Sequence, residues 1–213
     1  MKQEIAKILL DLNAVALRLD PPFTWASGRK SPIYCDNRLI ISSPNDRKKV
    51  AAEFVALIAR NGWQPDVIAG TATAGIPHAA WVADMMNLPM VYVRGSAKGH
   101  GKENRIEGTL RPGQKVVMIE DLISTGKSSI DAANGVVDAG GDLLGVAAIF
   151  TYGLQKAVQQ FTDAKMPFDT LTTFEALMDV AEELGTLTGE QKEIIATWQI
   201  DPGQWSADRG GAA

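Results

Sequence analysis

The chain has 213 residues, of which 46% are hydrophobic and 22% charged, and this composition excludes a disordered or fibrous protein. Its 21 basic and 25 acidic side chains give a formal charge of −4, so the chain as a whole does not attract nucleic acid or anionic membranes. Any anion-binding site must therefore be local. Cys35 is the only cysteine, which excludes an internal disulfide and a cysteine-based metal cluster and suits a reducing compartment.

The sequence shows no segment typical of export or of a membrane span. Residues 1–5 include charged and polar side chains where a signal peptide needs apolar ones. The most apolar late run, residues 143–150, is far shorter than the roughly 20 residues of a membrane helix. We therefore expect a cytoplasmic protein with no membrane partner and no nucleic-acid partner.

The N-terminal part predicts two helices separated by a small irregular element. Apolar residues at helical spacing predict a helix over residues 5–19, ended by Pro21 and Pro22. Residues 23–42 contain turn signals and short apolar stretches at Tyr34 and at 39–41 that could pair as strands, so we expect a hood formed by about residues 1–42. A second helix is expected over residues 43–62.

The middle of the chain alternates short apolar strands with helices. Strands are expected at residues 67–69, 90–93, 116–119 and 143–150, and helices at 75–86 and 126–137. This alternation predicts an α/β fold in which helices cover both faces of a parallel sheet, within a single domain of residues 1–213. The C-terminal third predicts two or three more helices, one opened by a capping box at Thr188–Gln191, and a mobile tail at about 206–213.

The segment with the clearest chemistry starts with Glu120 and Asp121 at the end of a predicted strand. In open α/β sheets, ligands bind beyond the carboxyl ends of the strands. The hydroxyls that follow, at Ser124, Thr125 and positions 128–129, enter a helix N-terminus and suit a phosphate monoester. Two carboxylates beside a phosphate need another task, such as holding sugar hydroxyls or orienting Mg²⁺. A phosphorylated sugar satisfies both requirements.

This segment also resembles two other kinds of turn. Gly126-Lys127-Ser128 matches the end of a nucleotide-binding P-loop, but that motif needs a glycine five positions earlier, where this chain has Asp121. The P-loop is therefore excluded. An ordinary capped turn between strand and helix remains the minor alternative.

Two further segments predict anion contacts. Residues 70–77 follow a strand, open a helix and consist largely of small residues, so their backbone N–H groups can approach an anion, although the segment taken alone could be a tight turn. Residues 94–105 carry a net charge of +3 in an acidic chain and are rich in glycine. Such a segment can be a solvated loop or a lid that closes over a leaving anion.

The motif at residues 116–128 resembles the phosphoribosyl pyrophosphate (PRPP) signature of the type I phosphoribosyltransferases: an apolar strand, two acids, two apolar residues and a hydroxyl-rich turn with glycine. The segment from Phe23 to Tyr34 is similar to the N-terminal segment of the orotate-using members, and the resemblance extends over nearly the whole chain. It implies the type I phosphoribosyltransferase fold.

The resemblance also implies an activity. Such an enzyme transfers the phosphoribosyl group of PRPP to orotate and releases orotidine 5′-phosphate and pyrophosphate in pyrimidine (UMP) biosynthesis. Mg²⁺ would be held mainly through PRPP rather than by a separate set of protein ligands. The cationic loop would reach into the site of a neighbouring subunit, which implies a homodimer. A PRPP-sensing regulatory protein and a phosphoribosyltransferase for another base are the alternatives.

The resemblance assigns roles to individual residues. It implies catalytic roles for Arg94, Lys98, His100 and Asp121, and contacts to PRPP from Arg94, Lys98, His100, Glu120, Asp121, Leu122, Ile123, Ser124, Thr125, Gly126, Lys127 and Ser128. It implies a pyrophosphate loop formed by Thr71, Ala72, Thr73, Ala74 and Gly75, and contacts to orotate from Tyr34 and Ser124.

The chain departs from the family pattern at several cationic positions. Ala26, Ala74 and Gly95 stand where many members have lysine, and Tyr152 lies near the position of an arginine that binds the orotate carboxylate. We expect Arg29, Lys30 or Arg38, with backbone donors near Tyr34 and Ser124, to compensate. His78 is expected to be packed or capping rather than catalytic.

Overall fold

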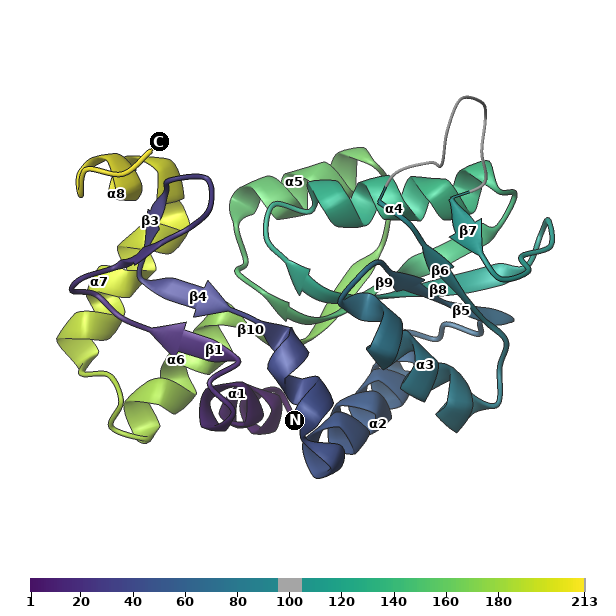
Figure 1. The fold of residues 1–213 in the computed structure, drawn as a ribbon, viewed down its shortest axis with the longest axis horizontal. Coiled ribbons are helices and arrows are strands. Elements are labelled where there is room, and N and C mark those ends of the chain that lie inside the picture. The colour runs from purple at the N-terminus through teal and green to yellow at the C-terminus, as the bar shows by residue number, and fades with distance from the viewer. Residues whose placement is uncertain (96–104, 213) are drawn as a thin grey trace.

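The computed structural model describes residues 1–95 and 105–212. Its centre is a six-stranded sheet with the order β10-β9-β8-β5-β6-β7, in which only the last pair of strands is antiparallel. The strands are β5 (Val67–Thr71), β6 (Met90–Val93), β7 (Ile106–Glu107), β8 (Lys115–Ile123), β9 (Asp142–Thr151) and β10 (Phe168–Thr173). This sheet confirms the predicted α/β class (Figure 1).

Helices cover both faces of the sheet because residues of each central strand alternate between two cores. In β8, Val117 and Ile119 belong to the larger core, whereas Val116 and Met118 belong to the smaller one. The larger core lies under α1 (Lys2–Asp11), α2 (Pro44–Arg60), α3 (Gly75–Met86) and α6 (Phe174–Glu183), and the smaller core lies under α4 (Lys127–Asp138) and α5 (Gln155–Asp163). No helix in the described part of the chain combines the length and apolar character of a membrane span.

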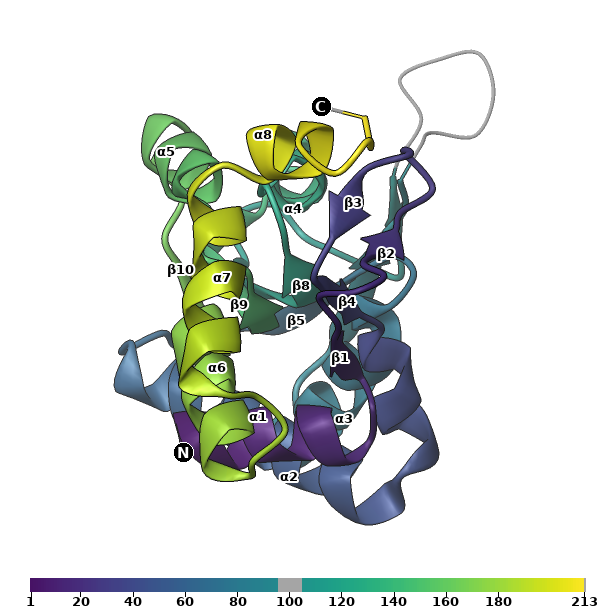
Figure 2. The ribbon, with the colours of Figure 1, turned by 90° about the vertical axis from the view of Figure 1, so that its left-hand side faces the viewer.

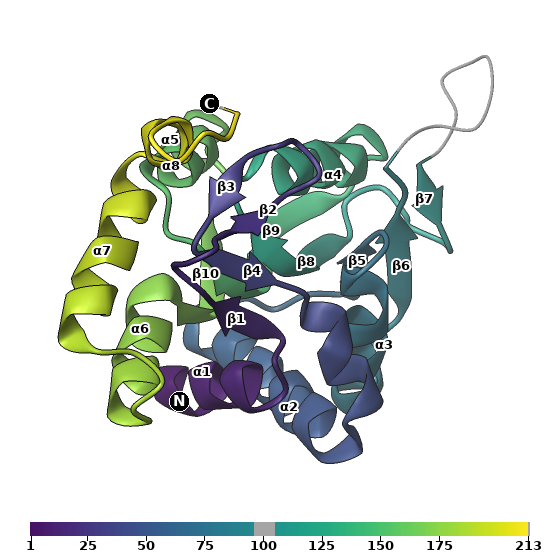
Figure 3. The ribbon, with the colours of Figure 1, turned by 60° about the vertical axis from the view of Figure 1, so that its left-hand side comes forward.

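After α1, the segment predicted as a hood consists of two antiparallel strand pairs and a 3₁₀ helix. β1 (Val15–Leu17) pairs with β4 (Ile33–Cys35), β2 (Phe23–Thr24) pairs with β3 (Lys30–Ser31), and η1 (Asn37–Ser42) follows. Figure 3 shows these strands in front of the central sheet. The Asn37 side chain donates a 2.7 Å hydrogen bond to the carbonyl oxygen of Asp121, which fixes the hood to the end of β8.

Two predictions for the N-terminal part were wrong. The first helix ends at Asp11 rather than at residue 19, because Asn13 adopts a left-handed conformation (φ 52°) and residues 15–17 pair with β4. Residues 39–41 form part of η1 instead of a strand, and the side chain of Asp36 caps that helix. In the first place pairing with β4 overrides the local apolar pattern, and in the second a local cap favours a 3₁₀ helix over a strand.

The C-terminal part was only partly predicted. The capping box at Thr188 is present and opens α7 (Gly189–Ile200), which α8 (Pro202–Ala207) follows. The edge strand β10 was missed because two of its three buried positions, Thr170 and Thr172, are polar and only Leu171 is apolar. The Thr172 hydroxyl donates a 2.9 Å hydrogen bond to the carbonyl oxygen of Lys2, which satisfies that buried group.

The chain after α8 packs against the hood. Ser206 is fully buried; its hydroxyl accepts a hydrogen bond from the backbone N–H of Lys30 (2.8 Å) and donates one to the carbonyl oxygen of Ala212 (2.6 Å). The backbone N–H of Ala212 donates to Gly28 at 3.0 Å. Figure 2 shows α8 and the end of the chain beside β3. The mobility of residues 206–213 stays a prediction, and these contacts of residues 206–212 argue against it.

Replacing Ser206 by alanine is expected to lower the free energy of unfolding by about 1–3 kcal/mol, because the hydrogen bonds of its hydroxyl with the N–H of Lys30 and the carbonyl of Ala212 are lost, each worth about 0.5–1.5 kcal/mol. Urea denaturation measures the change. Ser27→Ala, at an exposed position of the same hood, is the control. Equal stabilities of the two variants would show that the hydroxyl bridge contributes nothing.

Candidate active site

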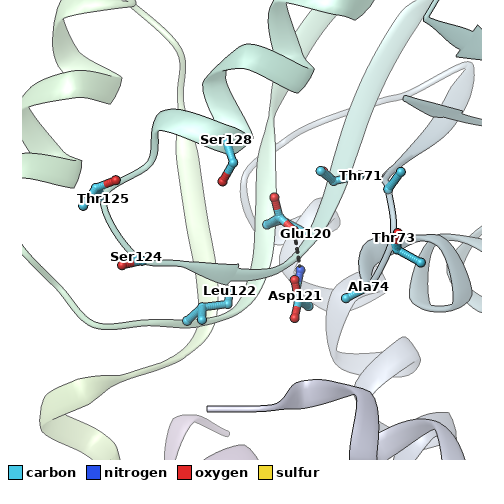
Figure 4. A pocket seen from close by; sticks show the side chains of 10 residues that line it. Thr71, Thr73, Ala74, Glu120, Asp121, Leu122, Ser124, Thr125 and Ser128 are labelled. Atoms are coloured by element: carbon cyan, nitrogen blue, oxygen red, sulfur yellow. Dashed lines mark hydrogen bonds between the residues drawn. The ribbon is translucent and has the colours of Figure 1, made fainter. Parts of the chain in front are cut away.

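A pocket of about 310 Å³ lies beyond the carboxyl ends of β5 and β8. Two segments of the chain meet there: the turn after β5, and the acidic end of β8 with the turn that leads into α4. The lining residues are Thr71, Ala72, Thr73, Ala74, Glu120, Asp121, Leu122, Ser124, Thr125 and Ser128. All ten belong to the sets predicted to bind PRPP or pyrophosphate, and Figure 4 shows them around one space.

The acidic pair has two different environments. Glu120 is 5% exposed; its carboxylate accepts hydrogen bonds from the Ser129 hydroxyl (2.9 Å) and from the backbone N–H of Asp121 (3.0 Å). Asp121 is half-buried, and its side chain lies at the pocket between Glu120 and Ala74 (Figure 4). The Asp121 carboxylate is thus the more accessible of the two to a ligand, while the Glu120 carboxylate accepts a hydrogen bond from the backbone of Asp121.

Burial makes both acids hold their protons more tightly than usual. Burial and then the negative charge of Asp121 raise the pKa of Glu120 to about 8. Burial also raises the pKa of Asp121. Because Glu120 keeps a proton at neutral pH, the pair carries less than its full negative charge, which reduces repulsion toward a phosphorylated ligand.

The turn after β8 has the backbone that an anion site requires. Gly126 adopts a left-handed conformation (φ 84°), and a Cβ there would lie 3.0 Å from the Phe161 ring, so glycine is needed for both reasons. Ser124, Thr125 and Ser128 line the pocket around the N-terminus of α4. Ser129 does not, because it is buried against Glu120.

Some residues predicted to bind PRPP lie outside the lining. The side chain of Ile123 is buried in the smaller core; Gly126 precedes α4, Lys127 begins it, and neither lines the pocket. Ile123 can therefore contribute only backbone groups.

The turn after β5 is held close to β8 by Gly75. A Cβ at Gly75 would lie 2.5 Å from the carbonyl oxygen of Ile119 and 3.5 Å from the Cα of Glu120, so no larger residue fits without a shift. This approach places Thr71–Ala74, the segment expected to form the pyrophosphate loop, beside the acidic pair. The peptide bond between Ala72 and Thr73 is cis.

The predicted cationic lid lies largely outside the described residues, including Lys98 and His100. At its start, Arg94 forms an ion pair with Glu107 (3.2 Å). At its end, Arg105 is bound to Asp131 on α4 at 2.6 Å and donates to the carbonyl oxygen of Arg94. Arg105 therefore anchors the base of this segment to the sheet and α4.

Tyr34, Lys30 and Arg38, which were expected to contact orotate or to compensate for the missing arginine, lie in the hood, and none of them lines the pocket. Tyr34 is 44% exposed, packs against Phe23 and is not part of the lining. Arg38 forms a two-pronged ion pair with Asp36 (2.6 and 2.7 Å), and the Lys30 ammonium donates to the Thr24 hydroxyl. These two cations, expected to compensate for a missing arginine, are thus already engaged.

Asn37 is the site residue that the sequence did not indicate. It is fully buried and joins η1 to Asp121, 84 positions away, and no local pattern in the sequence marks this contact. The expectation that His78 is packed is confirmed: it is fully buried on α3 with its ring edge-on to Trp81 (5.4 Å), and burial lowers its pKa to about 4.

The sequence and the fold of this chain are similar to those of known proteins. The family model of the phosphoribosyl transferase domain matches residues 41–181, which contain the whole pocket. A protein from Fusobacterium nucleatum named orotate phosphoribosyltransferase is 54% identical over 93% of this chain and 95% of its own length. One of the same name from Halalkalibacterium halodurans is 52% identical over 97% and 98%.

The chain belongs to the orotate phosphoribosyltransferase family. Solved structures agree on the fold of this family. UMP synthase from Leishmania donovani matches 96% of this chain and 42% of its own length, with a TM-score of 0.80 and 28% identity. An orotate phosphoribosyltransferase from Aeropyrum pernix matches 86% of this chain and 99% of its own length, with a TM-score of 0.74 and 24% identity, which supports the fold alone.

Proposed function

We propose that this protein transfers the phosphoribosyl group of PRPP to orotate, giving orotidine 5′-phosphate and pyrophosphate for pyrimidine (UMP) biosynthesis. The observation that carries the proposal is the pocket in which an acidic strand end, a hydroxyl-rich helix N-terminus and a turn of small residues meet. Each part suits one part of PRPP, and relatives more than 50% identical over nearly their full length carry the name of this activity.

We propose a place in the pocket for each substrate group. Ser124, Thr125 and Ser128 at the N-terminus of α4 would hold the 5′-phosphate through hydroxyls, N–H groups and the helix dipole. Asp121 would accept hydrogen bonds from the ribose hydroxyls. The turn from Thr71 to Ala74, on the opposite side of Asp121 in Figure 4, would hold the pyrophosphate.

The reaction needs electrostatic stabilisation rather than a nucleophile. When the bond between C1 of ribose and pyrophosphate breaks, positive charge develops on the sugar ring, and a carboxylate at Asp121 stabilises that charge. Glu120 holds the backbone N–H of Asp121 and so fixes its position. Arg94, Lys98 and His100 would stabilise the negative charge on the departing pyrophosphate, and His100 would protonate one of its oxygens.

The acids present fit a magnesium ion that is held mainly by PRPP. Asp121 offers one half-buried carboxylate at the pocket, and within residues 1–95 and 105–212 no group of three or more His, Cys, Asp or Glu side chains could hold a metal ion by itself. Mg²⁺ commonly keeps few protein ligands and binds through substrate phosphates. When bound with PRPP, it supplies positive charge that stabilises the leaving group.

We also propose that the protein is a homodimer in the cytoplasm. Segment 94–105 carries a net charge of +3, and in the described part its two ends are fixed by Arg94 and Arg105 close to β6 and β7. A lid attached there would extend to the site of a partner subunit. The single free cysteine, Cys35, suits a reducing compartment.

One assay separates this function from its alternatives. The protein is mixed with PRPP, Mg²⁺ and, in turn, orotate, adenine, hypoxanthine or uracil, and the release of pyrophosphate is measured. Release with orotate alone is expected. Release with another base would identify a different phosphoribosyltransferase, and release with none, together with tight PRPP binding, would favour a PRPP-sensing regulatory protein.

A further inference from the structure

Arg94 lies next to the turn that is proposed to hold pyrophosphate. It follows β6 directly, and the carbonyl oxygen of the preceding residue, Val93, accepts a 2.9 Å hydrogen bond from the backbone N–H of Ala72, which lines the pocket. The backbone N–H of Arg94 donates to the carbonyl oxygen of Arg105, also at 2.9 Å. The main chain at Arg94 is therefore fixed beside the turn after β5.

The side chain of Arg94 reaches toward the edge of the sheet instead of toward this turn. Its Nη1 lies 3.2 Å from Oε1 of Glu107 on β7. Because β6 lies between β5 and β7, Glu107 and the pocket are on opposite sides of the strand that carries Arg94. Arg94 is accordingly not among the residues that line the pocket. Its guanidinium is paired with a carboxylate of the protein itself.

Two arginines lie opposite each other here, and their acidic partners hold them differently. Arg94 and Arg105 face each other where β6 meets β7, and like charges in such positions repel. The Arg105 guanidinium binds both carboxylate oxygens of Asp131 on α4, at 2.6 and 3.2 Å. Within residues 1–95 and 105–212, Glu107 is the one ion-pair partner of Arg94, through a single contact. Arg94 is therefore the easier of the two to release.

The pair of Arg94 and Glu107 is exposed enough to be exchanged for a ligand. The two side chains are 23% and 42% exposed, and such ion pairs are weak because water and salt screen them. Pyrophosphate carries several negative charges, and phosphate oxygens accept two parallel hydrogen bonds from one guanidinium. A pyrophosphate at the turn after β5 is thus a stronger partner for Arg94 than the single carboxylate on β7.

We propose that the Glu107 carboxylate competes with pyrophosphate for the guanidinium of Arg94 and thereby sets how tightly the leaving group is held, an argument that rests on the proposed function. In the free protein Arg94 is paired with Glu107, and it moves to the pyrophosphate when PRPP binds. After the reaction the pair forms again and favours release of pyrophosphate. Equally tight binding of substrate and product would not accelerate the chemical step, and it would slow product release.

The test is isothermal titration calorimetry with inorganic pyrophosphate and Mg²⁺ on the parent, Glu107→Gln, Arg94→Ala and double-variant proteins. Glutamine keeps the size of Glu107 but loses its charge, so Arg94 is released to the ligand. The dissociation constant of pyrophosphate is expected to fall about 2- to 5-fold in Glu107→Gln, the size of effect of an exposed ion pair. In the Arg94→Ala background, Glu107→Gln should change nothing, because the two residues act through one contact.

Two controls accompany this measurement. Orotidine 5′-phosphate has no pyrophosphate group, so the parent and Glu107→Gln proteins should bind it equally. Glu183→Gln removes one negative charge at an exposed position on α6 and should bind pyrophosphate as the parent does.

Equal affinities of the parent and Glu107→Gln proteins for pyrophosphate would overturn the proposal. A weaker affinity in the variant would also overturn it, and would show that Glu107 orients Arg94 for the ligand. So would a gain that persists in the Arg94→Ala background, because it would reflect only the loss of a negative charge. If the parent binds neither pyrophosphate nor PRPP, the proposed function fails and this inference fails with it. The parent measurement thus separates the two failures.

Discussion

Replacing Asp121 by asparagine is expected to reduce kcat/KM for PRPP by about 100- to 1,000-fold, the size of effect seen when one preorganised electrostatic contact to a transition state is lost. The substitution removes the charge that stabilises the positive sugar ring but keeps the shape of the side chain. The contacts of the Asp121 backbone with Asn37 and Glu120 do not involve the carboxylate and should persist. Steady-state kinetics with orotate and PRPP measure the effect.

The Asp121 prediction needs a control for folding and for charge. Asp138→Asn removes one negative charge at an exposed position at the end of α4 and should leave kcat/KM within about twofold of the parent, as expected for a distant screened charge. Thermal unfolding should show that both variants are folded. An Asp121→Asn enzyme that retains a third or more of parental kcat/KM would remove this residue from the proposed mechanism.

Replacing Glu120 by glutamine is expected to raise the free energy of unfolding of the ligand-free protein at pH 8 by about 2–4 kcal/mol. Burial, with the charge of Asp121, raises the pKa of Glu120 from 4.5 to about 8. Between these values the folded state holds a proton that the unfolded state has released. Stability therefore falls as the pH rises through this window, and a neutral glutamine removes the loss.

The measurement is urea denaturation of parent and Glu120→Gln proteins between pH 5 and pH 8. Glutamine can keep both contacts, accepting from the N–H of Asp121 and donating to the Ser129 hydroxyl. Glu183→Gln, at an exposed position on α6, is the matched control and should follow the parent curve. A Glu120→Gln curve with the same slope as the parent would show that the buried carboxyl does not carry this proton.

The sheet and the pocket were predictable because their signals are continuous in the sequence. The central strands are covered on both faces, so they appear as unbroken apolar runs, and α3 and β6 have the predicted bounds. The pocket is formed by two short segments, each of which combines strand end, turn and helix start. β8 nevertheless extends past the predicted Ile119 to Ile123, because Glu120–Ile123 continue to pair with β9 despite their acidic start.

The hood and the edge of the sheet were less predictable because they depend on partners distant in sequence. β2 and β3 contain two residues each, too few for a periodic pattern, and β10 buries threonines that look polar in sequence. Tyr152 illustrates the same limit where the hood meets α7. Its neighbours Trp25 and Trp198 come from opposite ends of the chain, so only the folded structure brings the three rings together.

The hydrogen bond from Asn37 to the carbonyl of Asp121 joins the hood directly to the acidic end of β8. If a ligand moves the hood, this hydrogen bond transmits the movement to the peptide unit of Asp121. We then expect binding at the hood and binding at Asp121 to affect each other by the same factor in both directions.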